Sequence, residues 1–356
     1  MQIICLHVGA YDLQLFRIRN IMMPRSDTMN PLRGIHHVTA ITSSAEKIYQ
    51  FFTYVLGLRL VKKTINQDDI QTYHLFFADD RGNAGTDMTF FDFPGSVKGH
   101  KGRDELAITG FRVPDDAAIE YWKKRFEKYN INHHEIQTLF SRKMLFFNDF
   151  DGQEYALVSD ENNQGISSGT PWQKGPIPLE FAITGLGPMF VRVSESKTFG
   201  RILTDLLFMT KKETEGIYTR FDMGEGGNGG MMITITDSTS PLASQGFGSI
   251  HHVAFRVASR EELNEWIAYF TKMRAPHSGF VDRFYFQSLY TRLYRPVLFE
   301  FATEGPGFID DEESYETLGE TLALPPKFRS QRAKIESLVR HIDTKRSHLT
   351  FEKEYL

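Results

Sequence analysis

Residues 35–43 read IHHVTAITS and residues 250–258 read IHHVAFRVA, so one four-residue opening occurs twice, more than two hundred residues apart. Each copy starts as a short apolar strand and continues into a segment whose apolar residues have helical spacing. Two explanations compete: the doublets are strand starts in duplicated units, or they are two halves of one site that assembles on folding. The residues around the doublets bear on this choice.

A helix signal follows each doublet. Ser43 and Glu46 fit a capping box in the first copy, and Ser259 and Glu262 fit the same box in the second. Apolar residues then recur at helical spacing: Ile48, Phe51, Phe52 and Val55 in the first copy, and Leu263, Trp266, Ile267 and Phe270 in the second. The two stretches therefore predict equivalent strand–helix units.

Two further copies of this unit lie between the doublets, in LAITGFRVPDDAAIEYWKKRFEKY and LGPMFVRVSESKTFGRILTDLLF. Strand-like segments separated by turns follow each helix. Aligning the four opening strands places His37, Ile108, Pro188 and His252 at one equivalent position. The sequence thus predicts an α+β chain of four βαβββ modules, of which only the first and the last carry a histidine at this position.

The polar stretch DENNQGISSGTPWQKGPIP after the second module predicts an interdomain linker. We expect the chain to be divided as follows: an N-terminal extension at 1–32, a first domain of modules one and two at 33–165, the linker at 166–178, and a second domain of modules three and four at 179–305. Residues 306–356 should form a helical tail, with one apolar stripe made of Ile335, Leu338, Val339 and Ile342.

Composition favours a globular protein that acts on a small molecule. The 356 residues are 41% hydrophobic and 24% charged, and the formal net charge is −4. Because the net charge gives no sign of a basic surface, we expect neither nucleic acid nor a membrane surface as partner. Assembly into a homo-oligomer is left open by the sequence. The lone Cys5 and the absence of a signal-peptide pattern favour the cytoplasm.

Strand geometry separates the two histidines of each doublet, because neighbouring residues of a strand point to opposite faces. In the fourth module His251 shares its parity with apolar residues, which suits a helix-covered face. His252 shares its parity with small and polar residues, which suits an open face. We therefore expect His37 and His252 to point inward, and His36 and His251 to lie on the far face.

A third metal donor is available in the strand PVLFEFAT, where Glu300 stands among apolar residues. A buried carboxylate is costly unless it is paired, protonated or bound to a cation. The more ordinary explanation for a buried Glu300 is an ion pair with an arginine, but the two matching histidines favour a metal ion. Two histidines and one carboxylate leave positions of an octahedral ion open, which is typical of non-haem Fe(II) sites, whereas zinc more often has a closed tetrahedral shell.

The segments FYFQSLYTR and VLFEFAT should pair as a hairpin, which would place Tyr290 opposite Glu300. Arg283 could then supply positive charge to an anionic substrate or intermediate. The alternatives are an ordinary strand tyrosine and, for Arg283, a surface salt bridge to Asp282 or Asp311.

The chain resembles the vicinal oxygen chelate superfamily, which also contains glyoxalases and bleomycin-resistance proteins, and within it the hydroquinone-type ring-cleaving extradiol dioxygenases. The resemblance covers about residues 33–330 and rests on GIHHVTAIT, VLGLRLVKKTINQDD, SIHHVAFRV, DRFYFQSLY and VLFEFATEGPGF. It implies two domains of paired βαβββ modules, each a strongly curved mixed β-sheet with covering helices. One departure is the bulkier turn at Leu293–Pro296, where relatives typically have a Gly-rich turn; we expect this turn to change the rim of the pocket.

The resemblance also implies roles for individual residues. It implies a metal held by His37, His252 and Glu300, with Fe(II) as the expected ion and Mn(II) as the alternative. Tyr290, Arg283 and His251 would be catalytic, and His36 and Thr39 would contact the substrate.

The expected function is a ring-cleaving dioxygenase that inserts O2 into a hydroquinone-like or related phenolic aromatic. One alternative is a glyoxalase-like isomerase, whose metal typically has a second carboxylate; Asp87 and Asp92 lie near the relevant strand, but neither can be placed at the ligand position. The other alternative is a binding protein of the same fold, for aromatic compounds or drugs, which would need no metal.

Overall fold

The computed structural model describes residues 29–309 and 312–356. The predictions for Cys5 and Asp311 lie outside these residues, as does most of the expected N-terminal extension. Among the described residues, no helix has the length and apolar character needed to cross a membrane.

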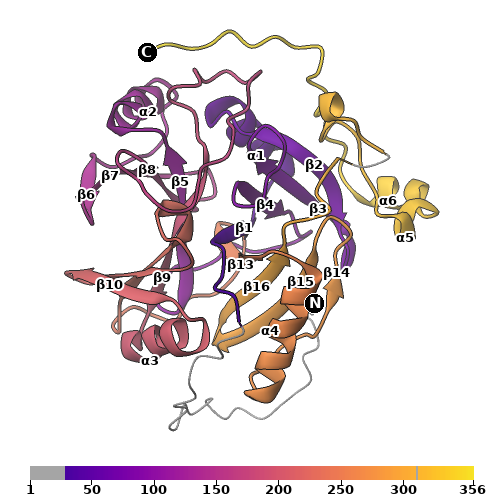
Figure 1. Ribbon diagram of the computed structural model, residues 1–356. Helices are drawn as coiled ribbons and strands as arrows, with labels where there is room; N and C mark the ends of the chain where they lie inside the picture. The colour runs from indigo at the N-terminus through magenta and orange to yellow at the C-terminus, as the bar shows by residue number, and fades with distance from the viewer. Residues whose placement is uncertain (1–28, 310–311) are drawn as a thin grey trace.

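The four predicted modules are present, each as strand, helix and further strands (Figure 1). Module one contains β1 (Ile35–Ile41), α1 (Ala45–Gln50), β2 (Arg59–Asn66), β3 (Asp69–Ala78) and β4 (Asp87–Phe91). Module two contains β5 (Glu105–Val113), α2 (Asp116–Lys128), β6 (Gln137–Leu139), β7 (Arg142–Asn148) and β8 (Glu154–Ser159).

The second half of the chain repeats this order. Module three contains β9 (Gly185–Val193), α3 (Ser196–Arg201), β10 (Thr210–Glu215), β11 (Tyr218–Asp222) and β12 (Met231–Thr236). Module four contains β13 (Ser249–Val257), α4 (Arg260–Lys272), β14 (Val281–Asp282), β15 (Gln287–Tyr294) and β16 (Val297–Thr303). In modules one and three the helix continues as a π-helical turn, at Phe51–Val55 and Ile202–Leu206.

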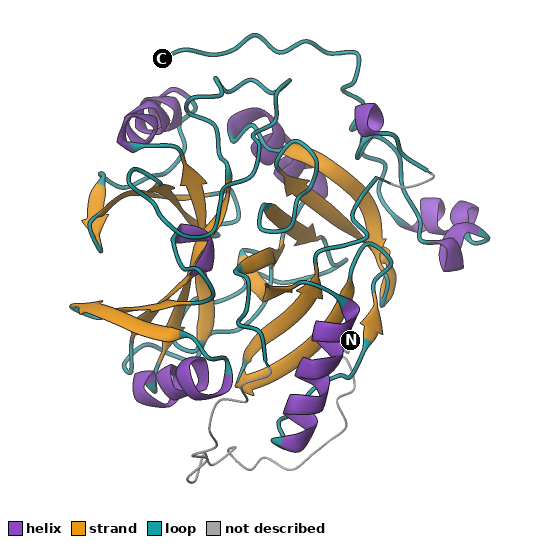
Figure 2. Cartoon of the chain, viewed as in Figure 1, coloured by secondary structure: helices purple, strands orange, loops and turns teal. Residues whose placement is uncertain are grey.

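The strands form two eight-stranded mixed sheets. One sheet pairs the first and last modules of the chain, and the other pairs the two middle modules. One sheet has the order β14-β15-β16-β13-β1-β4-β3-β2 and joins modules one and four. The other has the order β10-β11-β12-β9-β5-β8-β7-β6 and joins modules two and three. Both sheets are curved, and helices lie along their outer sides (Figure 2). The division of the chain at residues 166–178 stays a prediction, and the sheets extend across it.

The predicted helix cap is confirmed in module four and is shifted by one residue in module one. Ser259 caps α4 by accepting a hydrogen bond from the Glu262 amide, as predicted. In module one the predicted cap at Ser43 is wrong, because Ser44 caps α1. The amide and hydroxyl of Ser43 instead donate to Asp151, at 2.8 Å and 2.5 Å, and so tie module one to module two.

The C-terminal tail packs against the body with less helix than expected. It contains the short helices α5 (Pro326–Arg329) and α6 (Arg332–Leu338). Ile335 and Ile342 are buried, whereas Leu338 is exposed. The predicted stripe therefore does not form one continuous helical face, because the helix ends before Val339.

Candidate functional site

The register of the first sheet brings the predicted residues to one face. In the antiparallel pair β1–β13, His37 lies opposite Ala254 and Thr39 lies opposite His252. In the parallel pair β13–β16, Ala254 lies beside Glu300. Since paired residues of neighbouring strands point to the same side, His37, His252 and Glu300 share the concave face of this sheet.

These three side chains form a compact buried cluster. His37 Nε2 lies 3.2 Å from His252 Nε2, and Glu300 Oε2 lies 3.1 Å from His37 Nε2 and 2.9 Å from His252 Nε2. Among the described residues it is the one group of three or more His, Cys, Asp or Glu side chains with metal-compatible spacing. Two nitrogens and one oxygen at these distances could bind a metal ion.

The Glu300 carboxylate is ionised, although it is fully buried. Burial alone would raise its pKa, but the charge of His37 and hydrogen bonds from His252 and His37 outweigh burial and hold the pKa of Glu300 well below its usual value. An ionised carboxylate with two imidazoles beside it is the donor set that a divalent cation would neutralise.

The neighbouring histidines, His36 and His251, do not lie on the far face as expected from strand parity. The pairing of β1 with β13 is irregular between Ile35 and His37, and again between Thr39 and Ala40. At each irregularity one strand has an extra residue, which is His36 in the first case and His251 in the second. Such β-bulges place two successive side chains on nearly the same side, so each neighbour stays beside its doublet partner.

His36 orients the ring of His37 through a chain of hydrogen bonds. His36 Nε2 lies 3.0 Å from the Thr303 carbonyl, which can only accept, so His36 carries its proton on Nε2. Burial, then the charge of His37, lowers the pKa of His36 to about 3, so its ring is neutral. Its Nδ1 must accept from His37 Nδ1, 2.9 Å away. With its Nδ1 used in this contact, His37 presents Nε2 to the cluster as the nitrogen that could bind a metal.

The second doublet repeats the contact, with His251 Nδ1 lying 2.8 Å from His252 Nδ1. His251 is partly exposed and touches the rings of Phe91 and Phe93. Burial, followed by the charge of His252, holds the pKa of His251 well below its usual value. His251 is thus a neutral ring at the edge of the cluster, able to donate one hydrogen bond.

Thr89 occupies the place in module one that Glu300 occupies in module four. In module four the glutamate lies beside the residue two positions after His252. In module one Thr89 lies beside Thr39, which is two positions after His37. The cluster therefore has a hydroxyl, and not a second carboxylate, at the equivalent of its glutamate. Asp87 lies beside His37 and is fully buried, and Asp92 accepts from the Tyr73 amide, outside the cluster.

Thr39 and Thr89 link the cluster to His74, which sequence reasoning missed. Thr39 Oγ1 lies 2.9 Å from His252 Nε2 and 2.7 Å from Thr89 Oγ1. Thr89 Oγ1 lies 3.0 Å from His74 Nε2. His74 was missed because its distance from the cluster depends on the pairing of β3 with β4. Aligning module one on module four strand by strand would have identified Thr89.

Tyr290 lies directly opposite Glu300 in β15–β16, as predicted from the hairpin. Arg283 Nε donates to the Tyr290 hydroxyl at 3.1 Å, and the guanidinium lies over the phenol ring. Among the residues that the structure describes, the acidic partner of Arg283 is Asp68, at 2.9 Å, and not Asp282. Burial, then the charge of Glu300, raises the pKa of Tyr290 above its usual value, so the phenol keeps its proton.

Two further neighbours of the cluster carried no sequence signal. Ser288 Oγ donates to the second oxygen of Glu300, Oε1, at 2.5 Å and so fixes the carboxylate. The Phe286 ring packs against His36 and His37. The turn at Leu293–Pro296, which differs from the turn of the relatives, makes its contacts outside the cluster. The Tyr294 hydroxyl donates to Asp104 at 2.6 Å, and the Tyr294 ring contacts Phe199.

Comparison with known proteins finds a superfamily that includes dioxygenases, and relatives named as dioxygenases. The family model for the glyoxalase/bleomycin resistance protein/dioxygenase superfamily matches residues 34–157. The chain is 40% identical over 316 residues to MhqA of Bacillus subtilis (strain 168), a protein provisionally named a ring-cleaving dioxygenase, covering 87% of this chain and 99% of the relative.

A second relative has a more specific name. The chain is 27% identical over 307 residues to a chlorohydroquinone/hydroquinone 1,2-dioxygenase of Sphingobium indicum, covering 83% of this chain and 92% of the relative. The crystal structure of a protein from Bacillus subtilis, provisionally named a dioxygenase, superposes with a TM-score of 0.80 at 30% identity, covering 88% of this chain and 98% of that one.

Proposed function

Since the chain belongs to the glyoxalase/bleomycin resistance protein/dioxygenase superfamily, and within it to the ring-cleaving dioxygenases, we propose that it cleaves the ring of a hydroquinone-like aromatic with O2. The proposed metal ligands are His37, His252 and Glu300, and the proposed ion is Fe(II), with Mn(II) as the alternative. The chlorohydroquinone/hydroquinone 1,2-dioxygenase among its relatives supports this substrate class.

One observation carries the proposal: within the described part of the chain, the cluster offers three donors and no fourth. His37, His252 and Glu300 meet within hydrogen-bond distance on the concave face, while Thr89 stands where a second carboxylate would be needed for a four-ligand site. A 2-His-1-carboxylate set leaves positions open for two further molecules, which is the arrangement that suits non-haem Fe(II) and O2.

The spacing of the three donors suits a single metal ion. The three donor–donor distances lie between 2.9 and 3.2 Å. For bonds of about 2.1 Å, neighbouring ligands lie about 3.0 Å apart in an octahedron and about 3.4 Å apart in a tetrahedron. The donor distances thus suit one metal ion with bonds of this length, and the choice of iron or manganese over zinc rests on the three-donor set and on the dioxygenase relatives.

When bound by His37, His252 and Glu300, the metal would offer open positions to a ring hydroxyl and to O2. It would thereby allow electron transfer from the ring to O2. The overall reaction is balanced: both oxygen atoms enter the product, and one ring bond breaks beside a hydroxylated carbon. That carbon becomes a carboxylic acid, and its former neighbour becomes an aldehyde or another acyl group.

The side chains around the histidine–glutamate cluster would donate protons and stabilise negative charge. Tyr290 keeps its proton and receives a hydrogen bond from Arg283, so its own O–H is left to donate toward the cluster. Arg283 is mostly buried and brings a positive charge within reach of a developing anion. His251, neutral and at the edge, would donate a hydrogen bond to the same anion.

We propose that His36 and Thr39 act on the substrate side of the cluster as well. His36 has its Nε2 proton engaged by Thr303, so its part would be to pack against the ring and to hold His37. Thr39 lies 2.9 Å from His252 Nε2 and could donate to a substrate oxygen. The single cysteine of the sequence supports a cytoplasmic location. A homo-oligomer is compatible with the proposed function.

The two rivals make different demands. A glyoxalase-like isomerase would need a second carboxylate, and Thr89 stands at the equivalent position instead. A metal-free binding protein would have no need for an ionised glutamate buried between two imidazoles, which is costly without a cation.

Anaerobic reconstitution with Fe(II), Mn(II) or Zn(II), followed by oxygen uptake, tests the proposal. The panel should contain hydroquinone, catechol and their chlorinated analogues. We expect uptake with Fe(II) or Mn(II) and a hydroquinone. Stoichiometric zinc with isomerase activity, or no oxygen uptake with any phenol of the panel, would contradict the proposal.

A further inference from the structure

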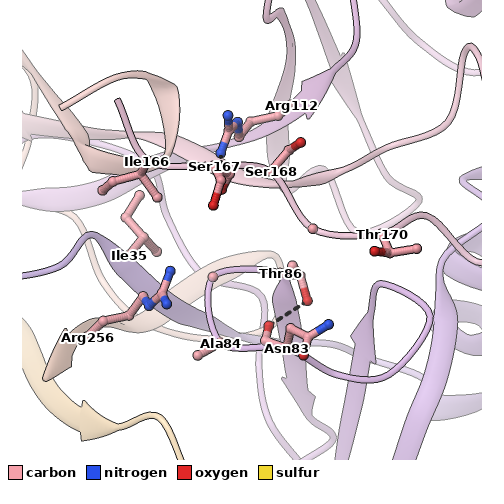
Figure 3. Close-up of a pocket in the computed structure, with 13 residues that line it drawn as sticks. Ile35, Asn83, Ala84, Thr86, Arg112, Ile166, Ser167, Ser168, Thr170 and Arg256 are labelled. Carbon is pink, nitrogen blue, oxygen red and sulfur yellow. Dashed lines mark hydrogen bonds between the residues drawn. The ribbon is translucent and has the colours of Figure 1, made fainter. Parts of the chain in front are cut away.

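A cavity of about 210 Å³ is lined by residues outside the histidine–glutamate cluster. It is formed where the start of β1, the loop between β3 and β4, the linker and the ends of β5 and β13 meet (Figure 3). None of its lining residues belongs to the cluster. Five of its thirteen lining residues are small and polar: Asn83, Thr86, Ser167, Ser168 and Thr170.

Two arginines enter this cavity from opposite walls. Arg112, near the end of β5, lies on one side with Ser167, and Arg256, near the end of β13, lies on the other with Ala84 (Figure 3). They occupy equivalent module positions, each four residues after the aligned positions Ile108 and His252. The cavity thus has a guanidinium from each of the two sheets.

Each guanidinium is held from behind by a carboxylate that does not line the cavity. Arg112 Nε and Nη2 contact Asp160 Oδ2 at 2.8 Å and 2.7 Å. Arg256 Nε and Nη2 contact Glu304 Oε1 at 3.3 Å and 3.0 Å. These ion pairs fix the two guanidinium planes and leave the Nη1 groups on the cavity side.

The Nη1 groups retain donor capacity. Arg112 Nη1 donates to the Ser167 carbonyl at 3.1 Å and has a second N–H left over. For Arg256 Nη1, no acceptor is present among residues 29–309 and 312–356. A guanidinium with unused N–H groups is a strong donor for carboxylate or phosphate oxygens.

Glycines keep the space beside both Nη1 groups free. A Cβ on Gly85 would lie 3.3 Å from Arg256 Nη1, and a Cβ on Gly229 would lie 3.0 Å from Arg112 Nη1. Gly85 also has a φ of +99°, which favours glycine by itself. Gly229 has no positive φ, and a Cβ there would also lie 3.2 Å from Ile166 Cγ2, so the space at this position is limited by both Arg112 and Ile166.

We propose that this cavity binds a small oxyanion, a carboxylate or phosphate group, between the Nη1 edges of Arg112 and Arg256. The polar rim of Ser167, Ser168 and Asn83 is exposed, which gives a ligand access from solvent. Arg112 is almost fully buried, so its hydrogen bond to an anion would be little weakened by water. The proposal does not depend on the ring-cleaving activity.

The competing explanation is structural: the two ion pairs would only fasten the linker and the tail of β16 to the body. Under that explanation an added anion gains nothing at Arg256, because Glu304 already neutralises the charge. The two explanations differ in whether the full chain binds an oxyanion through Arg256.

Isothermal titration of the metal-loaded full chain with inorganic phosphate, and separately with succinate, tests the proposal. Arg256→Gln removes the charged donors at a partly exposed position, and Gly229→Ala fills the space beside Arg112 without changing charge. Arg201→Gln is the matched control, because it removes an exposed arginine of another ion pair, with Asp205. We expect saturable binding to the unsubstituted chain, a loss of at least about tenfold in both cavity variants, and no change in the control.

The two arms identify the group: binding of phosphate alone supports a phosphate ligand, and binding of succinate alone supports a carboxylate ligand. Equal affinity in the unsubstituted chain and in Arg256→Gln would overturn the proposal, since it would place the anion elsewhere, for example on the metal. Absence of saturable binding of both anions to the unsubstituted chain would also overturn it. The readout is heat and not turnover, so it is independent of the proposed reaction.

Discussion

Tyr290 lies directly across the β15–β16 ladder from Glu300, and its hydroxyl accepts a hydrogen bond from Arg283 at 3.1 Å. The phenol is thereby fixed beside the cluster with its own proton free to be donated. Burial raises its pKa, followed by the charge of Glu300, and the nearby arginine does not reverse this shift. The raised pKa and the contact with Arg283 support the proposed role of Tyr290 as a proton donor.

Tyr290→Phe should therefore slow ring cleavage by a factor that does not vary with pH. We expect a loss of about 10²- to 10⁴-fold in kcat, the usual range for a general acid. The factor should be the same at about pH 6.5 and about pH 9, because the raised pKa keeps the phenol protonated at both. Steady-state oxygen uptake at both pH values measures this, with Tyr218→Phe as control; a factor that shrinks at high pH would show a titrating phenol.

Ser288→Ala should weaken metal binding without unfolding the chain. Ser288 donates to Glu300 Oε1 at 2.5 Å and leaves Oε2 for the cluster. Loss of a group that orients a metal ligand typically lowers metal affinity by about 10- to 100-fold. Competition with a chelator measures this affinity, and Ser314→Ala, an exposed serine bonded to Glu316, is the control. Unchanged metal affinity would mean that Ser288 does not position the carboxylate.

Thr89→Glu should convert the three-donor cluster into a four-donor one. Thr89 stands beside Thr39 as Glu300 stands beside Ala254, so a glutamate there would reach the cluster from the opposite side. We expect slower metal release to a chelator and reduced oxygen uptake, because one open position is filled. Thr89→Ser, which keeps the hydroxyl, should retain both properties. Normal oxygen uptake in Thr89→Glu would contradict the assignment of this position.

His74 should make the metal-free chain less stable as the pH falls. Burial, then the charges of His37 and His252, lowers the pKa of His74 well below its usual value in the folded chain. The unfolded chain binds this proton below about pH 6.5, so the contribution of His74 to stability is complete above that pH and is lost as the pH falls. Replacement by a residue that does not titrate should remove this dependence.

Urea unfolding of the metal-free chain and of His74→Gln measures the difference. Between about pH 8 and about pH 5.5, the unsubstituted chain should lose about 1 kcal/mol more of its free energy of unfolding than the variant does. An equal loss in both proteins would show that His74 takes up its proton as easily in the folded chain as in the unfolded one.

The sequence predicts the modules and the inward residues well, because both depend on local signals. The helix stripes and the cap at Ser259 are short-range features. Glu300 stands out because a carboxylate in an apolar strand needs a compensating charge. The position of Tyr290 follows from the length of a tight hairpin.

What the sequence could not predict depends on register between distant strands. His36 and His251 remain beside the cluster because of two bulges in the β1–β13 pair, whose strands are more than two hundred residues apart. Strand parity alone assigns them to the wrong face. The contacts of His74 and Thr89, and the pairing of modules one and four in one sheet, depend on the same long-range pairing.

The dependence of oxygen uptake on Glu300 tests the central claim most directly. Iron-loaded chain and Glu300→Gln, a variant of nearly equal size, should be compared for bound Fe(II) and for oxygen uptake with hydroquinone. We predict about one iron per unsubstituted chain with one O2 consumed per ring cleaved, and loss of both the iron and the uptake in Glu300→Gln. Oxygen uptake that persists in Glu300→Gln would contradict the claim that this buried cluster holds the metal for ring cleavage.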